Sequence, residues 1–291
     1  MDVLECRGLT KVYGKKEVVK QVDLTLEKGK IYGLIGRNGA GKTTLLSMLT
    51  AQNPATSGTV TYAGMPVWEN EQALSHLCFS RELGNSGTGA NGWKLKDYLR
   101  TASIYLPHWD KEMEQRLMEK FHLDRKQRIN KLSKGMASMV TIIVAMASKA
   151  DFTFLDEPTA GLDVIARQQF YRLLLEEMEE TGRTFVISTH IIEEASDAFD
   201  EVILMRRGEL FLKEKTQELL ERCVHVSGRA DALEAATRGM EVHAKERFGR
   251  GSGATVLLRP GERIPTNADL TVQPMSLENI FVALCGEGEE L

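Results

Sequence analysis

The stretch Gly36-Arg37-Asn38-Gly39-Ala40-Gly41-Lys42-Thr43-Thr44 decides the fold of this chain. A short apolar run typical of a strand precedes it at 30–35, and apolar residues at helical spacing follow it at 45–49. The three glycines allow a tight turn whose N–H groups face inward, beside the positive end of the following helix. The alternative is an ordinary glycine turn before a core helix. The pattern predicts a phosphate loop in which Lys42 reaches the β- and γ-phosphates and the Thr43 hydroxyl binds Mg²⁺.

A second chemical centre is the pair Asp156 and Glu157, which ends an apolar run that begins at Phe152. Such a run predicts a strand whose carboxyl edge lies beside the phosphate loop, where doubly wound sheets bind ligands. Because consecutive residues of a strand face opposite sides, the two acids are expected to differ in role. We expect Asp156 to hold Mg²⁺ through water and Glu157 to polarise the attacking water. A purely structural pair is disfavoured, because adjacent carboxylates repel each other unless a cation offsets them.

Two single residues are candidate site residues because of their positions in the sequence. Tyr13 lies upstream of the phosphate loop, and an aromatic ring there can stack on adenine, although a packed strand-end aromatic is the common alternative. His190 follows an expected strand at 184–188 and so lies at the same carboxyl edge. A lone histidine is usually only a surface or core residue, yet here it is expected to sense the γ-phosphate.

Composition limits the classes of protein that fit. The 291 residues suffice for one large domain with a small appendage, and a formal net charge of −4 gives no basic field for nucleic acid. The longest strongly apolar run, 140–147, is much shorter than the ~20 residues of a membrane span. The first residues carry no secretion-signal pattern. Four widely spaced cysteines predict reduced, structural thiols rather than disulfides or a zinc site.

Two further regions differ in sequence pattern from the parts that carry these motifs. Residues 83–150 have helical spacing and predict an inserted helical region, whose last helix, 140–147, is apolar all round. Ser133 and Gly135 precede that helix and are typical of a helix cap. Beyond residue 216 we expect strands at 224–227 and 254–258, a glycine loop at 249–253 and a final amphipathic helix.

The order and spacing of these motifs resemble the ATP-binding subunit of an ABC transporter over residues 1–215, about three quarters of the chain. The resemblance implies an α/β fold, namely a P-loop ATPase core of the ABC type with an antiparallel β-subdomain. It also implies that about 83–150 form an inserted helical subdomain and that 216–291 form a small C-terminal α+β extension.

Residue roles follow from the same resemblance. Tyr13 matches the adenine loop, Gly36 to Thr44 the phosphate loop, Asp156 and Glu157 the magnesium and catalytic carboxylates, and His190 the switch. Leu132 to Met136 match the signature, and Asp163 matches the dimer-contact loop. In such families the signature of one subunit covers the nucleotide held by the other, which gives Ser133 and Gly135 a role beyond capping.

The departures from the family pattern are specific. Lys134 and Met136 replace a glycine and a glutamine of the commonest signature. Glu82 stands where many relatives carry a glutamine, and its carboxylate can bind Mg²⁺ or water but cannot donate a hydrogen bond. The chain is similar to the branch that pairs with small exporter-like permeases for antimicrobial peptides, lipids and antibiotics.

The resemblance therefore implies a subunit that binds and hydrolyses ATP with Mg²⁺ and powers a separate integral membrane permease, with export as the expected direction. We expect a second nucleotide-binding subunit, with a homodimer favoured over a heterodimer, and a cytoplasmic location on the inner face of the membrane. A phosphate-loop kinase should not carry the signature and the switch. A soluble ABC-type ATPase acting on nucleic acid or ribosomes remains the alternative. It is disfavoured because the chain has neither an internal repeat nor sustained heptads.

Overall fold

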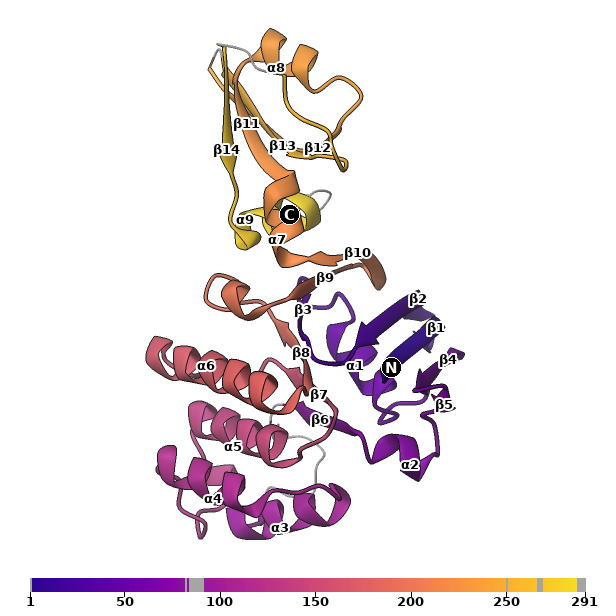
Figure 1. Ribbon diagram of the computed structural model, residues 1–291, viewed down its shortest axis with the longest axis vertical. Helices are drawn as coiled ribbons and strands as arrows, with labels where there is room; N and C mark the ends of the chain where they lie inside the picture. The colour runs from indigo at the N-terminus through magenta and orange to yellow at the C-terminus, as the bar shows by residue number, and fades with distance from the viewer. Residues whose placement is uncertain (1, 82, 84–91, 250, 266–268, 287–291) are drawn as a thin grey trace.

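The structure is a computed structural model that describes residues 2–81, 83, 92–249, 251–265 and 269–286. These residues form three β-sheets with helices packed around them (Figure 1). Glu82, the predicted substitute for glutamine, lies outside the described residues.

The central sheet has six strands, which are, in chain order, β3 (Ile31–Ile35), β6 (Leu77–Arg81), β7 (Phe152–Asp156), β8 (Thr184–Thr189), β9 (Glu201–Arg206) and β10 (Glu209–Lys215). In space their order is β10-β9-β3-β8-β7-β6, and every pairing is parallel except that of β9 with β10. β3 and β8 are buried along their whole length, as expected for parallel strands covered on both faces. The carboxyl ends of β3, β7 and β8 therefore meet at one edge.

The described residues of the same part of the chain also form the α-helices α1 (Lys42–Leu49), α2 (Glu71–Leu74), α3 (Leu95–Tyr105), α4 (Lys111–Lys120), α5 (Lys134–Ala147) and α6 (Val164–Thr181). The helices α3, α4 and α5 lie between β6 and β7 in sequence and form one end of the molecule (Figure 1). The second half of α5, from Val140 to Ala147, is buried throughout, as its apolar sequence predicted.

An antiparallel sheet packs beside the central one and contains β1 (Val3–Tyr13), β2 (Lys16–Glu27), β4 (Ser57–Tyr62) and β5 (Met65–Pro66), in the order β2-β1-β4-β5. Helix α1 lies between the two sheets, because one hydrophobic cluster contains side chains from all three elements, such as Leu26, Leu46 and Phe154. This arrangement confirms the predicted fold class of an α/β core with an antiparallel β-subdomain.

The third sheet and its helices follow β10 in sequence: α7 (Thr216–Arg222), β11 (Cys223–Arg229), α8 (Ala230–Ala236), β12 (Glu241–Phe248), β13 (Gly251–Leu257), β14 (Leu270–Pro274) and α9 (Leu277–Cys285). The sheet order is β12-β13-β11-β14, and all of its pairings are antiparallel. The predicted loop at 249–253 was wrong in part, because residues 251–253 belong to β13. Strands on both sides hold that segment in the ladder, which overrides its glycine content.

The end of the chain also packs on the central core. Buried residues of α7 and α9, including Leu219 and Ile280, belong to the same hydrophobic cluster as Ile31 and Ile35 of β3. Arg206 Nη1 at the end of β9 donates a 3.0 Å hydrogen bond to the carbonyl of Leu284 near the end of α9. Helix α9 is thereby fixed beside the strand that neighbours β3.

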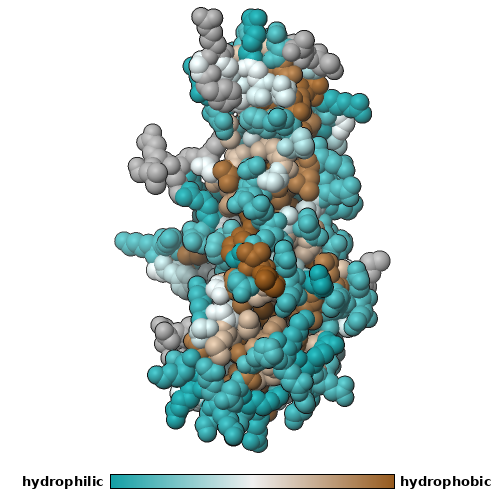
Figure 2. All heavy atoms as spheres, turned by 90° about the vertical axis from the view of Figure 1, so that its left-hand side faces the viewer, coloured by the Kyte–Doolittle hydropathy of each residue, from teal (hydrophilic) through white to brown (hydrophobic). Residues whose placement is uncertain are grey.

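No helix within the described ranges has the length and apolar character needed to cross a bilayer. On the face in Figure 2 hydrophilic side chains predominate, and hydrophobic atoms form several smaller areas, one of them near the middle.

Candidate active site

The phosphate-loop sequence forms the connection between β3 and α1. Gly39 and Gly41 have φ values of +82° and +103°, which favour glycine, and Gly41 is the residue that precedes the first turn of α1. A Cβ atom at Gly41 would lie 2.7 Å from the carbonyl oxygen of Val18, and one at Gly36 would lie 2.6 Å from that of Met205. Both glycines are therefore required by the close approach of neighbouring backbone, and the loop is held between β2 and β9.

Lys42 is folded back across this loop. Its side chain is buried, and Nζ donates hydrogen bonds to the carbonyls of Gly36 at 2.6 Å and Arg37 at 3.4 Å. Nζ also lies 4.0 Å from Glu157 Oε1. Burial lowers the pKa of Lys42, and the negative charges of Glu157 and Asp156 oppose that shift. The ammonium group is thus centred among the groups that the sequence predicted to act together.

Asp156, the last residue of β7, is held by two hydroxyl groups. The Thr43 hydroxyl donates a 2.6 Å hydrogen bond to Oδ2, and the Ser188 hydroxyl donates one to Oδ1. Within the described part of the chain no cluster of three or more His, Cys, Asp or Glu side chains could hold a metal. A hydroxyl and a carboxylate still fit Mg²⁺, which prefers oxygen ligands and usually takes only one or two from the protein beside phosphate and water.

Glu157 has different partners from Asp156, as expected, but strand alternation is not the cause. It lies just beyond β7 with a φ of +50°, so a bend of the chain rather than strand alternation turns its side chain away from Asp156. Its N–H donates to both the carbonyl and the hydroxyl of Ser188, at 3.1 Å each. Its Oε2 lies 2.7 Å from His190 Nδ1. The structure therefore brings Glu157 and His190 into direct contact.

Ser188 is a residue of this site that the motifs missed. Its side chain contacts both Asp156 and the backbone of Glu157. The available signal was its position, because it is two residues before His190 on the strand predicted to end at the same edge.

Tyr13 is the last residue of β1 and is half exposed, at 49%. Its hydroxyl accepts a 2.5 Å hydrogen bond from Asn53 Nδ2, and Lys11 Nζ lies 5.0 Å from the ring centroid. The register pairs Tyr13 with Lys16, two residues before Val18, whose carbonyl borders Gly41. The ring is thus exposed on the hairpin that flanks the phosphate loop.

Ser133, Gly135 and Asp163 lie together at the beginnings of α5 and α6. Ser133 caps α5 by accepting from Met136 N at 3.2 Å, so the helix-cap interpretation is confirmed, and Asp163 caps α6 by accepting from Ala166 N at 2.8 Å. A Cβ atom at Gly135 would lie 2.7 Å from the carbonyl oxygen of Gly161. The signature residues therefore rest directly on the loop that follows Glu157.

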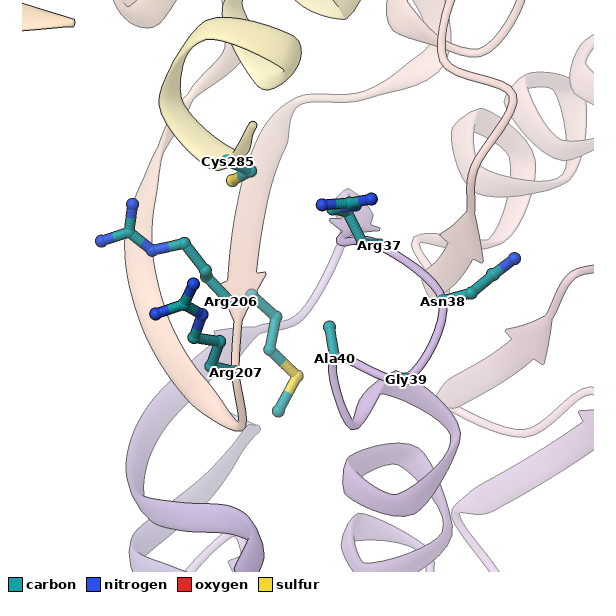
Figure 3. A pocket seen from close by; sticks show the side chains of 8 residues that line it. Arg37, Asn38, Gly39, Ala40, Arg206, Arg207 and Cys285 are labelled. Atoms are coloured by element: carbon teal, nitrogen blue, oxygen red, sulfur yellow. The ribbon is translucent and has the colours of Figure 1, made fainter. Parts of the chain in front are cut away.

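A cavity of about 80 Å³ lies beside the phosphate loop, lined by loop residues, Arg206, Arg207 and Cys285 (Figure 3). Its volume corresponds to a few water molecules, whose share of liquid volume is about 30 Å³ each. Arg37, Asn38, Gly39 and Ala40 form the loop side of the cavity, and Cys285 of α9 lies across from them in Figure 3.

Comparison with known proteins shows which proteins this chain is similar to. A sequence profile described as "ABC transporter" matches residues 19–160. The ABC transporter ATP-binding protein YtrB of Bacillus subtilis (strain 168) is 25% identical over 290 residues, which cover 98% of each chain. The bacitracin transport ATP-binding protein BcrA of Enterococcus faecalis is 31% identical over 224 residues, covering 76% of this chain and 71% of its own. A solved dimeric ATP-binding cassette bound to ADP and Pi superposes with a TM-score of 0.62 at 21% identity, covering 73% of this chain and 98% of that one.

Proposed function

This chain belongs to the ABC transporter family as an ATP-binding subunit, and from that membership we propose how its residues bind and cleave ATP. It is an ATPase whose nucleotide site lies at the carboxyl edge of the central sheet. The triphosphate lies over Gly36 to Thr44, where the N-terminus of α1 favours an anion. Lys42 then exchanges its contacts with the Gly36 and Arg37 carbonyls for contacts with the β- and γ-phosphates.

Thr43 and Asp156 are the residues we assign to Mg²⁺. The Thr43 hydroxyl would bind the ion directly, and Asp156 would bind it through water. The two groups lie 2.6 Å apart, so both are within reach of one ion. Glu82 is assigned to the same ion as a further oxygen ligand. When bound, the ion neutralises charge that develops on the phosphates.

Glu157 carries the proposal, because it lies between Lys42, 4.0 Å from one carboxylate oxygen, and His190, 2.7 Å from the other. In hydrolysis, Glu157 orients a water whose oxygen forms a bond to the γ-phosphorus as the bond to the ADP oxygen breaks. Its carboxylate accepts the proton that the water loses. His190, held by Glu157, contacts the γ-phosphate, and Tyr13 stacks on the adenine.

The second half of the site comes from another cassette. Ser133, Gly135 and the loop containing Asp163 form a surface that caps a γ-phosphate held by a partner subunit, with a homodimer favoured over a heterodimer. ADP lacks that phosphate and holds the two subunits less well. The difference in affinity converts hydrolysis into opening of the dimer.

We assign a separate integral membrane permease as the partner that uses this motion, with export as the direction and the inner face of the cell membrane as the location. A groove beside α2 and the end of α3 fits its cytoplasmic segment. Trp68, Ile104 and Tyr105 line it and are 48%, 69% and 80% exposed, and Glu69 and Glu71 add negative charge. The expected occupant is an amphipathic segment with an apolar face and basic flanks. Action on nucleic acid is disfavoured by the net charge of −4.

Glu157→Gln tests the assignment of the catalytic carboxylate. The variant should bind ATP with near-normal affinity, hydrolyse it at least ~100-fold more slowly, as for loss of a general base, and accumulate as a dimer. Gel filtration with ATP and Mg²⁺ measures the dimer, and the same variant with ADP is the control. A persistent monomer at high concentration would assign the second site to an unlike subunit. Undiminished hydrolysis would remove Glu157 from the mechanism.

Copurification tests the permease. Trp68→Ser together with Tyr105→Ser should abolish recovery of a membrane protein from native membranes while ATP binding persists. Wild-type protein should not bind protein-free liposomes. Retention of the membrane partner by the double variant would exclude this groove as the docking surface.

A further inference from the structure

Two chain segments leave the carboxyl edge of the central sheet side by side. One, 157–163, follows β7 and leads into α6, and the other, 190–196, follows β8. They are joined near the sheet by the contact of Glu157 with His190 and by the hydrogen bond from Glu157 N to the Ser188 carbonyl. They are joined a second time by Arg167, in the helix α6 that follows the first segment, and Glu194 of the second segment.

The second junction is a forked ion pair. Arg167 Nε donates to Glu194 Oε2 at 2.5 Å, and Nη2 donates to Oε1 at 2.7 Å. Two parallel hydrogen bonds fix the relative orientation of the groups as well as their separation, which a single lysine contact cannot do. The remaining nitrogen, Nη1, donates to the Leu162 carbonyl at 3.4 Å.

The guanidinium group of Arg167 therefore touches both segments. Leu162 lies between Gly161, which packs against Gly135, and Asp163, which caps α6. On the other side, Glu194 is four residues beyond His190 in a segment held by short turns, such as the hydrogen bond from Ser196 N to the Ile192 carbonyl. Arg167 thus links the loop at Leu162 to the segment that carries His190.

We propose that Arg167 and Glu194 are positioning residues for ATP hydrolysis, which keep His190 against Glu157 and link that contact to the loop beneath the signature. The inference rests on the proposed roles of Glu157 and His190. The hydrogen bonds of Arg167 go to Glu194 and to the Leu162 carbonyl, so the proposal gives the pair no direct contact with the nucleotide. Their effect is on where His190 lies when the γ-phosphate is bound.

A simple stabilising role for the pair predicts a different outcome. The two side chains are 18% and 22% exposed, and a purely structural ion pair at this position would change the thermal midpoint without a selective effect on kcat. By contrast, a misplacement of a catalytic group by about 1 Å can reduce the rate ~100-fold. Loss of the pair should therefore slow turnover much more than it destabilises the fold.

The first experiment measures kcat, KM and the thermal midpoint of Arg167→Lys and Glu194→Gln. We expect kcat to fall ~10-fold or more, within the ~100-fold limit for such misplacement, with ATP affinity within about twofold of wild type. Arg222→Met is the matched control, because Arg222 also pairs with a glutamate, Glu214, and donates to a backbone carbonyl, that of Leu258 at 2.7 Å. That control should leave kcat unchanged.

The second experiment repeats Glu194→Gln in a His190→Ala background under single-turnover conditions. If the pair acts through His190, Glu194→Gln should cause no further loss there, whereas an equal loss in both backgrounds would overturn the inference. Exchanged charges, Arg167→Glu with Glu194→Arg, should recover part of the lost rate. Full activity of His190→Ala alone would contradict both the inference and the proposed role of His190. If Glu157→Gln remains fully active while the two backgrounds differ as expected, the proposed role of Glu157 fails, and only the part of the inference in which the pair positions His190 stands.

Discussion

The hydroxyl of Thr43, at the start of α1, donates a 2.6 Å hydrogen bond to Asp156 at the end of β7. The two residues are 113 positions apart in the sequence, and the bond joins the phosphate loop to the strand that carries both acids. Ser188 adds a second hydroxyl to the same carboxylate from β8. Three neighbouring elements of the sheet edge thus converge on one oxygen-rich point.

Asp156→Asn should reduce the affinity of the nucleotide site for Mg²⁺ by ~10–100-fold, the usual effect of losing a group that orients the ligands of a metal. ATP affinity in the presence of EDTA should be unchanged. Isothermal calorimetry with ATP, with and without Mg²⁺, separates the two quantities. Thr43→Ser retains the hydroxyl and is the control. An unaltered magnesium dependence of Asp156→Asn would exclude Asp156 from the metal site.

Lys42→Ala should weaken ATP and ADP binding by ~2–5 kcal/mol, the range for truncating one member of a buried charged contact. The weaker binding is expected because the variant lacks the buried ammonium group that would contact the β- and γ-phosphates. AMP, which lacks the β- and γ-phosphates, should bind the variant as it binds wild type. Equal losses for AMP and ATP would indicate a disrupted loop instead of a lost phosphate contact.

Tyr13→Ala should weaken all adenine nucleotides by ~1–3 kcal/mol, the range for a base stacked on an aromatic ring. Tyr13→Phe keeps the ring and loses only the hydrogen bond from Asn53, so its affinity should stay near that of wild type. Calorimetry on both variants tests this. Unchanged ATP affinity in Tyr13→Ala would end the adenine assignment.

Arg183→Met should lower the free energy of unfolding by ~3–5 kcal/mol, the usual cost of leaving one member of a buried ion pair alone. Arg183 is only 3% exposed, and its guanidinium pairs with Glu177 at 2.8 Å and donates to the carbonyls of Ala145 and Met146 at the end of α5. Burial lowers the pKa of Arg183, and Glu177 opposes the shift. Urea denaturation measures the loss, with Arg229→Met at an exposed pair as the control. A change below ~1 kcal/mol, typical of surface pairs, would contradict this account.

Much of the site could be predicted because its chemistry is local in sequence. The glycines of the loop, Lys42 and Thr43 all lie within one short stretch of sequence. An apolar strand that ends in two acids likewise indicates the carboxyl edge of the sheet. The bend at Glu157 could not be predicted, because a φ of +50° at a glutamate runs against local preference. The surrounding contacts with Ser188 impose it.

The unpredicted parts depend on long-range pairing. Strands β12 and β14 contain many polar and exposed residues, and their pairing with β13 and β11 decides their conformation. Arg167 and Glu194 also carried no signal, because charged residues 27 positions apart are ordinary until the fold brings them together.

The hydrophobic cluster shared by α7, α9 and β3 extends beyond the last catalytic motif. The part of the chain that packs together is therefore longer than the part that carries the motifs. Every motif lies before residue 215, yet Leu219, Ile280 and Leu284 complete the core on which β3, and therefore the phosphate loop, is built. A chain that ended at residue 215 would keep every motif residue, but it would expose to water the apolar surface that α7 and α9 cover. Residues beyond 215 therefore contribute to the stability of the sheet that carries the phosphate loop.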